Sequence, residues 1–261
     1  MLDQASIKKI PWHDLTEYSV FDTLKELSLP FLWFVLSLVA LNYLFLLGVI
    51  CVGYTFLFGL RVAHNAFHRA LGLPRWANDW VMLFISWILI GSNHAVYVTH
   101  MYHHKHCLED GDAEGKLAHY SFWGAVLRSP IYPFQIHIKA LKIASFDNQL
   151  WITLELLTSA IFHFVIFPTL IGSGYFIYLG MMLLANLLAP MFSTWIVHRD
   201  CEEQGGQARS CRSSTLNFLT GNMFYHHEHH LFPGVPSRRM PELGARLDAY
   251  TQETGLMLFG K

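Results

Sequence analysis

Two long apolar blocks dominate the hydrophobic pattern of this chain. No charged side chain lies between Leu29 and Leu60, and none lies between Leu156 and Val197. A helix of about 20 apolar residues crosses the roughly 30 Å core of a bilayer, so each block is long enough for two spans joined by a turn. Glycine and polar residues suit such a reversal, which places the turns near Asn42–Tyr43 and at Gly172–Gly174. The pattern therefore predicts four membrane spans, at about 24–41, 44–63, 151–171 and 174–196.

Composition agrees with a membrane protein. Apolar residues make up 53% of the 261 residues and charged residues 14%, whereas soluble domains carry about 25% charged residues. A net charge of −1 without a basic run argues against a nucleic-acid partner. Because no internal repeat or linker interrupts the pattern, we expect residues 1–261 to form one all-α membrane domain of two helical hairpins.

The placement of basic residues predicts the orientation in the membrane. All 18 lysines and arginines lie before the first block, between the blocks or after the second, and neither predicted hairpin turn carries one. By the positive-inside rule, both termini and the long middle segment are expected to face the cytoplasm. The protein is thus expected to be a multi-pass integral membrane protein.

The chemistry is concentrated in histidines, of which the chain has 16. Nine of them lie just outside the apolar blocks, in three clusters and one isolated position. They are His64 and His68; His100, His103 and His104; His226, His229 and His230; and His198. All nine fall on the side predicted to be cytoplasmic, so we expect a single site in a helical cap at that face.

The spacing of these histidines suits metal binding. Intervals of three and four residues place each cluster on one face of a helix. One zinc ion takes four ligands, so nine imidazoles suit two metal ions that keep open positions. Nitrogen-rich ligation of a redox metal favours iron, although zinc and copper remain open at this point.

Other residues could support the metals or the substrate. Metal-bound histidines need a carboxylate or carbonyl on their second nitrogen. Acidic candidates near the clusters are Asp79, Glu109, Asp110, Asp112, Asp200, Glu202 and Glu228. Thr194 lies one helical turn before His198 and could hold a metal-bound water. His163 lies inside a span, where polar groups are rare, and either lines a substrate cavity or bonds a neighbouring helix. Cys107 is expected to be a small filler side chain.

Two further segments are expected to be helical. Trp80–Val98 is apolar, but a full span there would place the first two clusters on opposite sides of the membrane. We therefore predict an interfacial or partly buried helix, with Trp80 and Trp87 at headgroup depth. Pro241–Gly255 carries leucines at helical spacing and is predicted to be a short helix that covers the cap.

The clusters resemble the histidine boxes of the integral-membrane fatty acid desaturase superfamily. The most specific part is the run from His226 to Pro236, which reads HHEHHLFPGVP. The resemblance implies four spans in two hairpins and a cytoplasmic cap with two irons. It also implies O2 as co-substrate and a separate electron donor, a ferredoxin or a cytochrome b5-type protein. Carried over residue by residue, the implied ligands are His64, His68, His100, His103, His104, His198, His226, His229 and His230.

Some residues depart from the pattern of many desaturases. Asn65 stands where many members have aspartate, and Thr194 aligns with an asparagine that binds metal through water in some members. The strings His100–His106, Thr194–Arg199 and Ala208–Ser210 resemble bacterial carotenoid ketolases more closely. These departures leave open which product the reaction forms, but they do not change the expected metal chemistry.

The sequence favours an oxidase that acts on a lipid-like substrate, with acyl-chain desaturation as the leading prediction. Hydroxylation or ketolation of a carotenoid or another lipid is the alternative, because both outcomes begin with removal of hydrogen from carbon. A zinc-dependent hydrolase would keep the site but change the metal. A membrane metal transporter is a distant alternative, since the spans contain few polar groups that could form a path.

Overall fold

The computed structural model describes residues 9–171, 174–202 and 206–254, and this part of the chain is helical without a strand. The principal helices are α2 (Val20–Tyr43), α3 (Phe45–Phe67), α4 (Arg75–Leu89), α5 (Asn93–Lys105), α6 (Phe122–Arg128), α7 (Tyr132–Ile143), α8 (Phe146–Ile161), α9 (Phe167–Ile171), α10 (Gly174–Pro190), α11 (Ile196–His198), α12 (Ser214–Leu219), α13 (His226–Leu231) and α14 (Met240–Thr254). Shorter 3₁₀ or π turns are η1 (His13–Thr16), η2 (Gly115–His119), η3 (Ser129–Ile131), η4 (Phe162–Ile166), η5 (Met191–Trp195) and η7 (Ser237–Arg239).

Four helical stretches are long and apolar enough to cross a membrane, as the sequence predicted. They are Val20–Tyr43, Phe45–Phe67, Phe146–Ile171 and Gly174–His198, with mean hydropathy between 1.7 and 2.0. Each contains the corresponding predicted span almost entirely. The predicted turn at Gly172–Gly174 lies partly outside the described residues, because the description omits 172–173.

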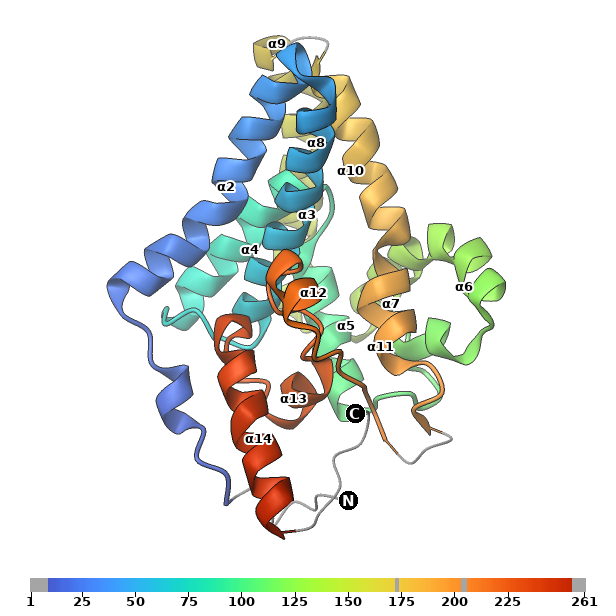
Figure 1. Cartoon of the computed structure of the whole chain (residues 1–261). Helices are drawn as coiled ribbons and strands as arrows, with labels where there is room; N and C mark the ends of the chain where they lie inside the picture. Colours follow the sequence, from blue (N-terminus) through green and yellow to red (C-terminus); the bar gives the residue numbers. More distant parts are fainter. Residues whose placement is uncertain (1–8, 172–173, 203–205, 255–261) are drawn as a thin grey trace.

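The first two spans, α2 and α3, pack along each other (Figure 1). Helix α2 begins at a capping box in which the Ser19 side chain accepts from the backbone N–H of Asp22 and Asp22 bonds back to Ser19. Such a box satisfies backbone donors that the helix start leaves free. The break between the helices lies at Leu44, directly after the predicted turn at Asn42–Tyr43.

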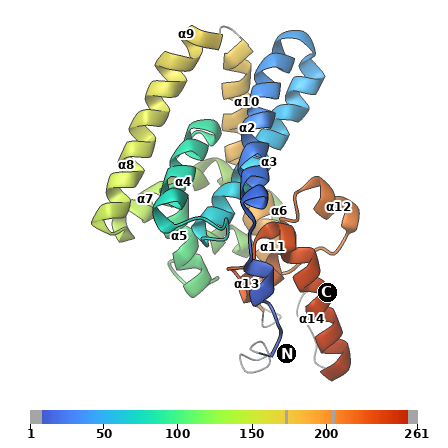
Figure 2. The same ribbon diagram turned by 90° about the vertical axis from the view of Figure 1, so that its left-hand side faces the viewer.

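The other two spans are each interrupted by a π-helical turn, η4 and η5. The second of these directly follows Pro190, which lacks the N–H that an α-helix needs at that position. The α8–η4–α9 stretch approaches α10 near α9 and diverges from it toward the other end (Figure 2). Helices α4 and α5 contact α8, and α7 contacts α10, so shorter helices occupy the space that the divergence opens.

The single helix predicted over Trp80–Val98 is wrong. The segment forms two helices, α4 and α5, that meet at an angle of 113°. The break occurs at Ile90 and Gly91, which have φ angles of 62° and 152°. A glycine adopts such angles without the steric cost of a side chain. Because of this bend, the histidines at the end of α5 do not lie along the axis of α4.

The end of the bundle opposite α9 is covered by α13, α14 and the N-terminal segment (Figure 1). Its apolar cluster joins Ile10, Leu15, Phe232, Leu243 and Leu247, all nearly fully buried. The helix predicted over Pro241–Gly255 is confirmed as α14, within the residues that the structure describes. The packing of these segments places the third histidine cluster, on α13, beneath the ends of α3 and α5.

Candidate metal centre

The nine histidines come from four helix ends. His64 lies in the last turn of α3 and His68 caps that helix. The second cluster lies in the last turns of α5, His198 ends α11, and the third cluster lies on α13. The fold brings these ends together, and the side chains form two neighbouring groups.

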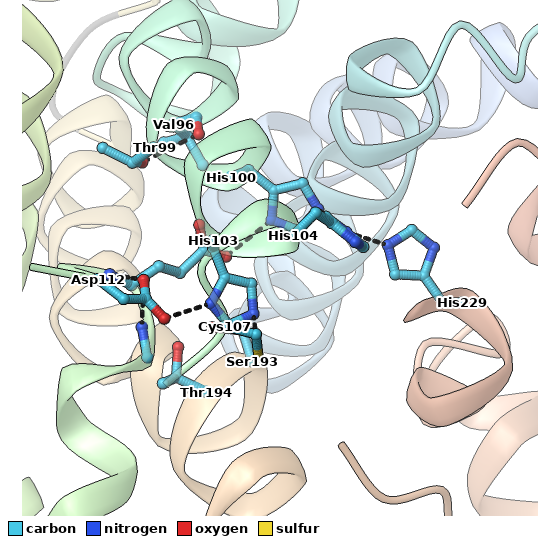
Figure 3. A network of polar contacts seen from close by, with 12 residues as sticks. Val96, Thr99, His100, His103, His104, Cys107, Asp112, Ser193, Thr194 and His229 are labelled. Atoms are coloured by element: carbon cyan, nitrogen blue, oxygen red, sulfur yellow. Dashed lines mark hydrogen bonds and ion pairs between the residues drawn. The ribbon is translucent and has the colours of Figure 1, made fainter. Parts of the chain in front are cut away.

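The first group consists of His64, His68, His100 and His229, whose ligand nitrogens all lie within 4.8 Å of one another. The Nε2 atoms of His68 and His100 are 3.0 Å apart. His104 joins this group, because its Nε2 lies 3.1 Å from that of His100 and 2.9 Å from that of His229 (Figure 3).

The second group consists of His103, His198, His226 and His230, again with ligand nitrogens within 4.8 Å of one another. The Nε2 atoms of His226 and His198 are 2.8 Å apart, and those of His230 and His226 are 3.2 Å apart. His104 also stacks on His230, with ring centroids 4.5 Å apart, so the two groups adjoin.

The second ring nitrogens explain why the Nε2 atoms face inward with lone pairs. The Nδ1 of His103 is bonded to Asp112 at 2.7 Å, that of His100 to Glu114 at 2.9 Å, and that of His198 to the backbone oxygen of Gln207 at 2.7 Å. These acceptors hold the hydrogen on Nδ1.

A neutral imidazole protonated at Nδ1 has no hydrogen left on Nε2. The Nε2 lone pairs of His100 and His198 therefore face other imidazole nitrogens, at 3.0 Å from His68 and 2.8 Å from His226, and a cation satisfies them better than a neighbouring ring does. The donor set of each group fits a metal ion with four or five nitrogen ligands.

Burial keeps most of the clustered imidazoles in the neutral form that binds metal. It lowers the pKa well below the usual value for His68, His100, His226, His229 and His230. Burial also lowers the pKa of His104 to about 3. Near pH 7 these rings are thus neutral, and metal ions need not displace protons from them.

The Asp112–His103 pair behaves differently. Burial acts to lower the pKa of His103, but the bond to Asp112 outweighs it and raises that pKa well above its usual value. Burial acts to raise the pKa of Asp112, and the same bond holds it below its usual value. The Asp112 carboxylate also accepts from the backbone N–H groups of Leu108 and Gly115, at 3.0 Å each. Asp112 is therefore a fixed anion that orients His103.

Asn65, the neighbour of His64 on α3, is bonded to Ser237, which follows the run His226–Pro236. Its Nδ2 donates to Glu26 Oε1 at 3.2 Å, and its Oδ1 accepts from the N–H and Oγ–H of Ser237 at 3.1 and 2.9 Å. Glu26 is also paired with Arg61 at 2.7 Å, and all these side chains are buried. An aspartate at position 65 would place two carboxylates against each other. Asparagine at position 65, where many desaturases have aspartate, therefore avoids repulsion with the carboxylate of Glu26.

Cys107 lies beside the second group. Its Sγ is 3.7 Å from Nε2 of His103 and 3.9 Å from Nδ1 of His198, and it also contacts the backbone oxygen of Gln207. Figure 3 shows the Asp112 carboxylate and the cysteine at opposite nitrogens of the His103 ring. His103, Cys107 and Asp112 together form a third set of potential ligand atoms within 4.8 Å.

The remaining predicted acids lie apart from the histidine nitrogens described above. Asp110 is exposed, and Asp200 is exposed beside Arg199 and Arg209 at 3.9 and 4.0 Å. Glu228 is buried within the third cluster, but its carboxylate bonds to Ser210 and Arg212. It thus ties α13 to the preceding loop.

Thr194 and His163 occupy different environments. Thr194 is fully buried in η5, and its Oγ1 lies 3.3 Å from the hydroxyl of Tyr132. His163 is buried in η4 and its Nδ1 bonds to the hydroxyl of Tyr175. The structure thus places His163 in a bond to a neighbouring helix, which was one of its two expected roles.

An apolar cavity of about 790 Å³ adjoins both groups. His64, His100 and His229 of the first group line it, and so does His226 of the second. Its apolar walls come from α3, α7, α10 and the α4–α5 break, and include Phe56, Leu60, Leu89, Ile136, Leu187 and Phe192. His163 is not part of this lining. The volume lies within the range of about 300–1,000 Å³ that small-molecule sites occupy.

Sequence reasoning missed several residues of the site. Glu114, which bonds His100 and lines the cavity, was not among the acidic candidates. Burial raises its pKa to about 7. His137 also lines the cavity, and its Nε2 accepts from the backbone N–H of Ser92 at 3.1 Å. The run Asp110–Glu114 contains three acidic residues, but the sequence does not show which of them contacts a histidine. The conformation of the turn before η2 decides this.

Comparison with known proteins agrees with this geometry. The profile of the family described as Fatty acid desaturase matches residues 37–260. A protein named Beta-carotene ketolase from Paracoccus sp. strain N81106 is 29% identical over 204 residues, which cover 72% of this chain and 74% of the relative. A protein of the same name from Paracoccus sp. strain PC1 is 29% identical over 189 residues, covering 69% and 71%. The chain therefore belongs to the fatty acid desaturase family of membrane oxidases.

Proposed function

We propose that this protein is an O2-dependent dimetal oxidase that acts on a lipid-like molecule held in the apolar cavity. The observation that carries the proposal is the position of His64, His100, His226 and His229. These side chains belong to two metal-compatible groups and also line the cavity. A substrate in the cavity would lie directly against both groups. Such proximity supplies much of the rate of an enzymatic reaction.

We assign the nine histidines as ligands of two iron ions. Nitrogen-rich donors favour a redox metal over a hard cation, and family membership supports iron. Bound iron would supply the activation of O2 and the removal of hydrogen from an unactivated carbon. Electrons would come from a separate donor, a ferredoxin or a cytochrome b5-type protein.

The chain's own residues bind the substrate, exclude water and fix the ligands. The lining of the cavity is mostly apolar, so a hydrocarbon chain can pass from the bilayer into the cavity without burying an unpaired polar group against it. Asp112, Glu114 and the carbonyl of Gln207 fix the histidine rings, and such partners change metal affinity or activity by about 10–100-fold.

We further propose that the substrate is a carotenoid and that the product is a ketone. Both Paracoccus relatives carry the name Beta-carotene ketolase, and they cover more than two thirds of the chain. This ranking reverses the prediction from sequence, which favoured acyl-chain desaturation. Desaturation remains the second candidate, because the family as a whole is described as Fatty acid desaturase.

The proposed location is a membrane with both termini and the metal centre on its cytoplasmic side. The four apolar spans and the basic residues outside them support this orientation through the positive-inside rule. A cytoplasmic centre would be accessible to a soluble or peripheral electron donor.

Product analysis tests the proposal. The iron-loaded protein is incubated with O2, a matching reductant and membranes that contain both a carotenoid and acyl lipids. We expect keto groups on the carotenoid and unchanged acyl chains, and no product with the His100→Ala variant. New double bonds in acyl chains with unchanged carotenoids would overturn the substrate assignment. Absence of any O2-dependent product from the iron-loaded protein would overturn the oxidase proposal.

A further inference from the structure

A second cavity, of about 450 Å³, lies between the end of α3 and the starts of α4 and α8. None of the nine clustered histidines is part of its lining. The stretches that end and begin there, Phe45–Phe67 and Phe146–Ile171, are candidate membrane spans. The start of α8 lies far from α9, toward the end of the bundle that carries the cap (Figure 2). The cavity is therefore located where these two spans meet the membrane surface.

Four charged side chains line this second cavity, and their formal charges cancel. They are Arg69, Arg75, Asp79 and Asp147. Asp79 lies 3.5 Å from Nε2 of His94, whereas the side chains of the other three have no ion pair or hydrogen bond within the described part of the chain. Equal numbers of cations and anions complement a ligand that carries charges of both signs and no net charge.

A buried amide adds a hydrogen-bond acceptor to the lining. Asn78 lines the cavity and is 2% exposed, and its Nδ2 donates to the backbone oxygens of Leu73 and Pro74 at 3.1 and 3.0 Å. These two bonds fix the orientation of the amide. Its Oδ1 is buried and has no hydrogen bond to a described residue. A buried acceptor without a partner is costly, and an N–H donor bound in the cavity would remove that cost.

The lining changes from charged to apolar along both helices that form the outer wall. The apolar side chains lie farther from the helix starts and are Met82 on α4 and Leu150, Trp151 and Leu154 on α8. Leu154 lies about 10 Å beyond Asp147 along α8, because a helix rises about 1.5 Å per residue. Leu150 and Leu154 are 54% and 40% exposed, so this part of the lining is accessible to the bilayer.

The apolar surface continues onto the outer side of α4, which packs beside α8 (Figure 2). Trp80 and Phe84 are 46% and 40% exposed there. The rings of Trp80 and Trp151 are in contact, with centroids 5.6 Å apart, so this surface adjoins the cavity lining without a polar break. A charged pocket followed by an apolar surface has the same order of polarity as a phospholipid.

We propose that this second cavity binds a zwitterionic phospholipid whose headgroup carries a primary ammonium group. Arg69 and Arg75 bind the phosphate, since guanidinium groups match its oxygens in charge and geometry. Asp79, Asp147 and Asn78 accept hydrogen bonds from the ammonium group, which has three N–H donors. An acyl chain lies against the exposed apolar side chains of α4 and α8. The proposal depends on the membrane location and not on the proposed oxidase reaction.

The first test measures lipid affinity by native mass spectrometry of the full-length protein purified in detergent. The ligands are phosphatidylethanolamine, the anionic phosphatidylglycerol and the soluble headgroup phosphoethanolamine. We expect phosphatidylethanolamine to bind about tenfold or more tightly than phosphatidylglycerol, because the ammonium group adds charged hydrogen bonds. Equal affinity for the two lipids would overturn the assignment of a zwitterion. Displacement of the lipid by an equal concentration of phosphoethanolamine would overturn the assignment of a lipid.

The second test removes one cation from the cavity. Arg75→Gln should lower the affinity for phosphatidylethanolamine by about tenfold or more, since it removes a charged hydrogen-bond donor to the phosphate. Lys142→Gln is the matched control, because the exposed Lys142 of α7 lines neither cavity and its loss changes the net charge equally. This control should bind the lipid as wild type does. The same affinity in Arg75→Gln and Lys142→Gln would contradict the proposed site.

The third test removes one anion and changes the lipid preference. Asp147→Asn leaves the cavity with a net positive charge, so phosphatidylglycerol should bind at least as tightly as phosphatidylethanolamine. The Ser145 side chain still accepts from the backbone N–H of residue 148, so the start of α8 is preserved. Its unfolding temperature in lipid-free detergent should match that of wild type, which separates a binding effect from misfolding. A wild-type preference for phosphatidylethanolamine in this variant would contradict the role of Asp147.

Discussion

The two histidine groups differ in what surrounds them. His64, His100 and His229 of the first group line the apolar cavity, whereas only His226 of the second group does so. The second group is held more firmly by the protein, through Asp112 on His103 and the Gln207 carbonyl on His198. Under the proposed function, the first group would face the substrate in the cavity and the second group would anchor the centre to the fold.

The largest effects are expected from loss of a ligand. His229 and His230 are neighbours on α13 but belong to different groups, so His229→Gln and His230→Gln form a matched pair. Each should lower turnover by more than about 100-fold, because loss of a ligand exceeds loss of a ligand's partner. Each should also leave about one iron ion per chain, bound at the group that remains intact. Metal analysis together with product formation measures both effects.

His106→Gln is the control for this pair, since the half-buried His106 lies outside both groups and bonds to Glu109 at the surface. It should retain both iron ions and full turnover. If His229→Gln and His230→Gln lose the same metal, the division into two groups is incorrect.

Intermediate effects are expected from the carboxylates that orient the rings. Asp112→Asn should weaken metal binding at the second group by about 10–100-fold, and Glu114→Gln should do so at the first group. Titration of iron or cobalt into the metal-free protein, monitored by absorbance, distinguishes the two binding steps. Loss of affinity at the same step in both variants would contradict the separate roles of these acids.

A smaller effect on the metals is expected at Asn65, next to the first group. Asn65→Asp removes the donor to Glu26 and should lower the free energy of unfolding by about 1–3 kcal/mol. Metal affinity of the first group should fall by less than about tenfold, because His64 and His68 remain on α3. The double variant Glu26→Gln with Asn65→Asp exchanges donor and acceptor, and should restore iron content and the part of the thermal stability that does not depend on the Glu26–Arg61 ion pair. A double variant as defective as Asn65→Asp would show that this pairing is unimportant.

The smallest effect is expected at Cys107. Its Sγ is 3.7 Å from the nearest imidazole nitrogen, which suits packing beside the second group and not an essential bond. Cys107→Ser should keep both iron ions and a turnover within about twofold of wild type, because serine preserves the size of the side chain. Loss of one iron ion in this variant would instead identify the thiolate as a ligand.

The spans and the convergence of the histidines could be predicted from the sequence for a clear physical reason. Uncharged blocks of this length have few stable locations other than a membrane, and the histidine clusters directly flank them. The bend at Gly91 was not predicted, although a glycine followed by Ser92 as a helix cap signalled it. The apolar pattern alone did not show the break, because the residues on both sides of it, in α4 and at the start of α5, are buried.

The partners of individual histidines could not be predicted, because they depend on loop conformation. Asp110, Asp112 and Glu114 follow the second cluster with similar spacing, yet only the latter two reach a histidine of a group. Likewise, spacing along α5 did not indicate that His100 and His103 would enter different groups. His100 lies beside His64 of α3, whereas His103 lies beside His198 of α11.

The central claim is that the nine histidines hold two iron ions in one centre. The direct test is Mössbauer spectroscopy and metal analysis of protein that is loaded with ⁵⁷Fe under anaerobic conditions. We predict about two ferrous ions per chain, in nitrogen-rich sites, that oxidise together when O2 is admitted. A single iron per chain, or preferential binding of zinc with no iron signal that responds to O2, would contradict the account.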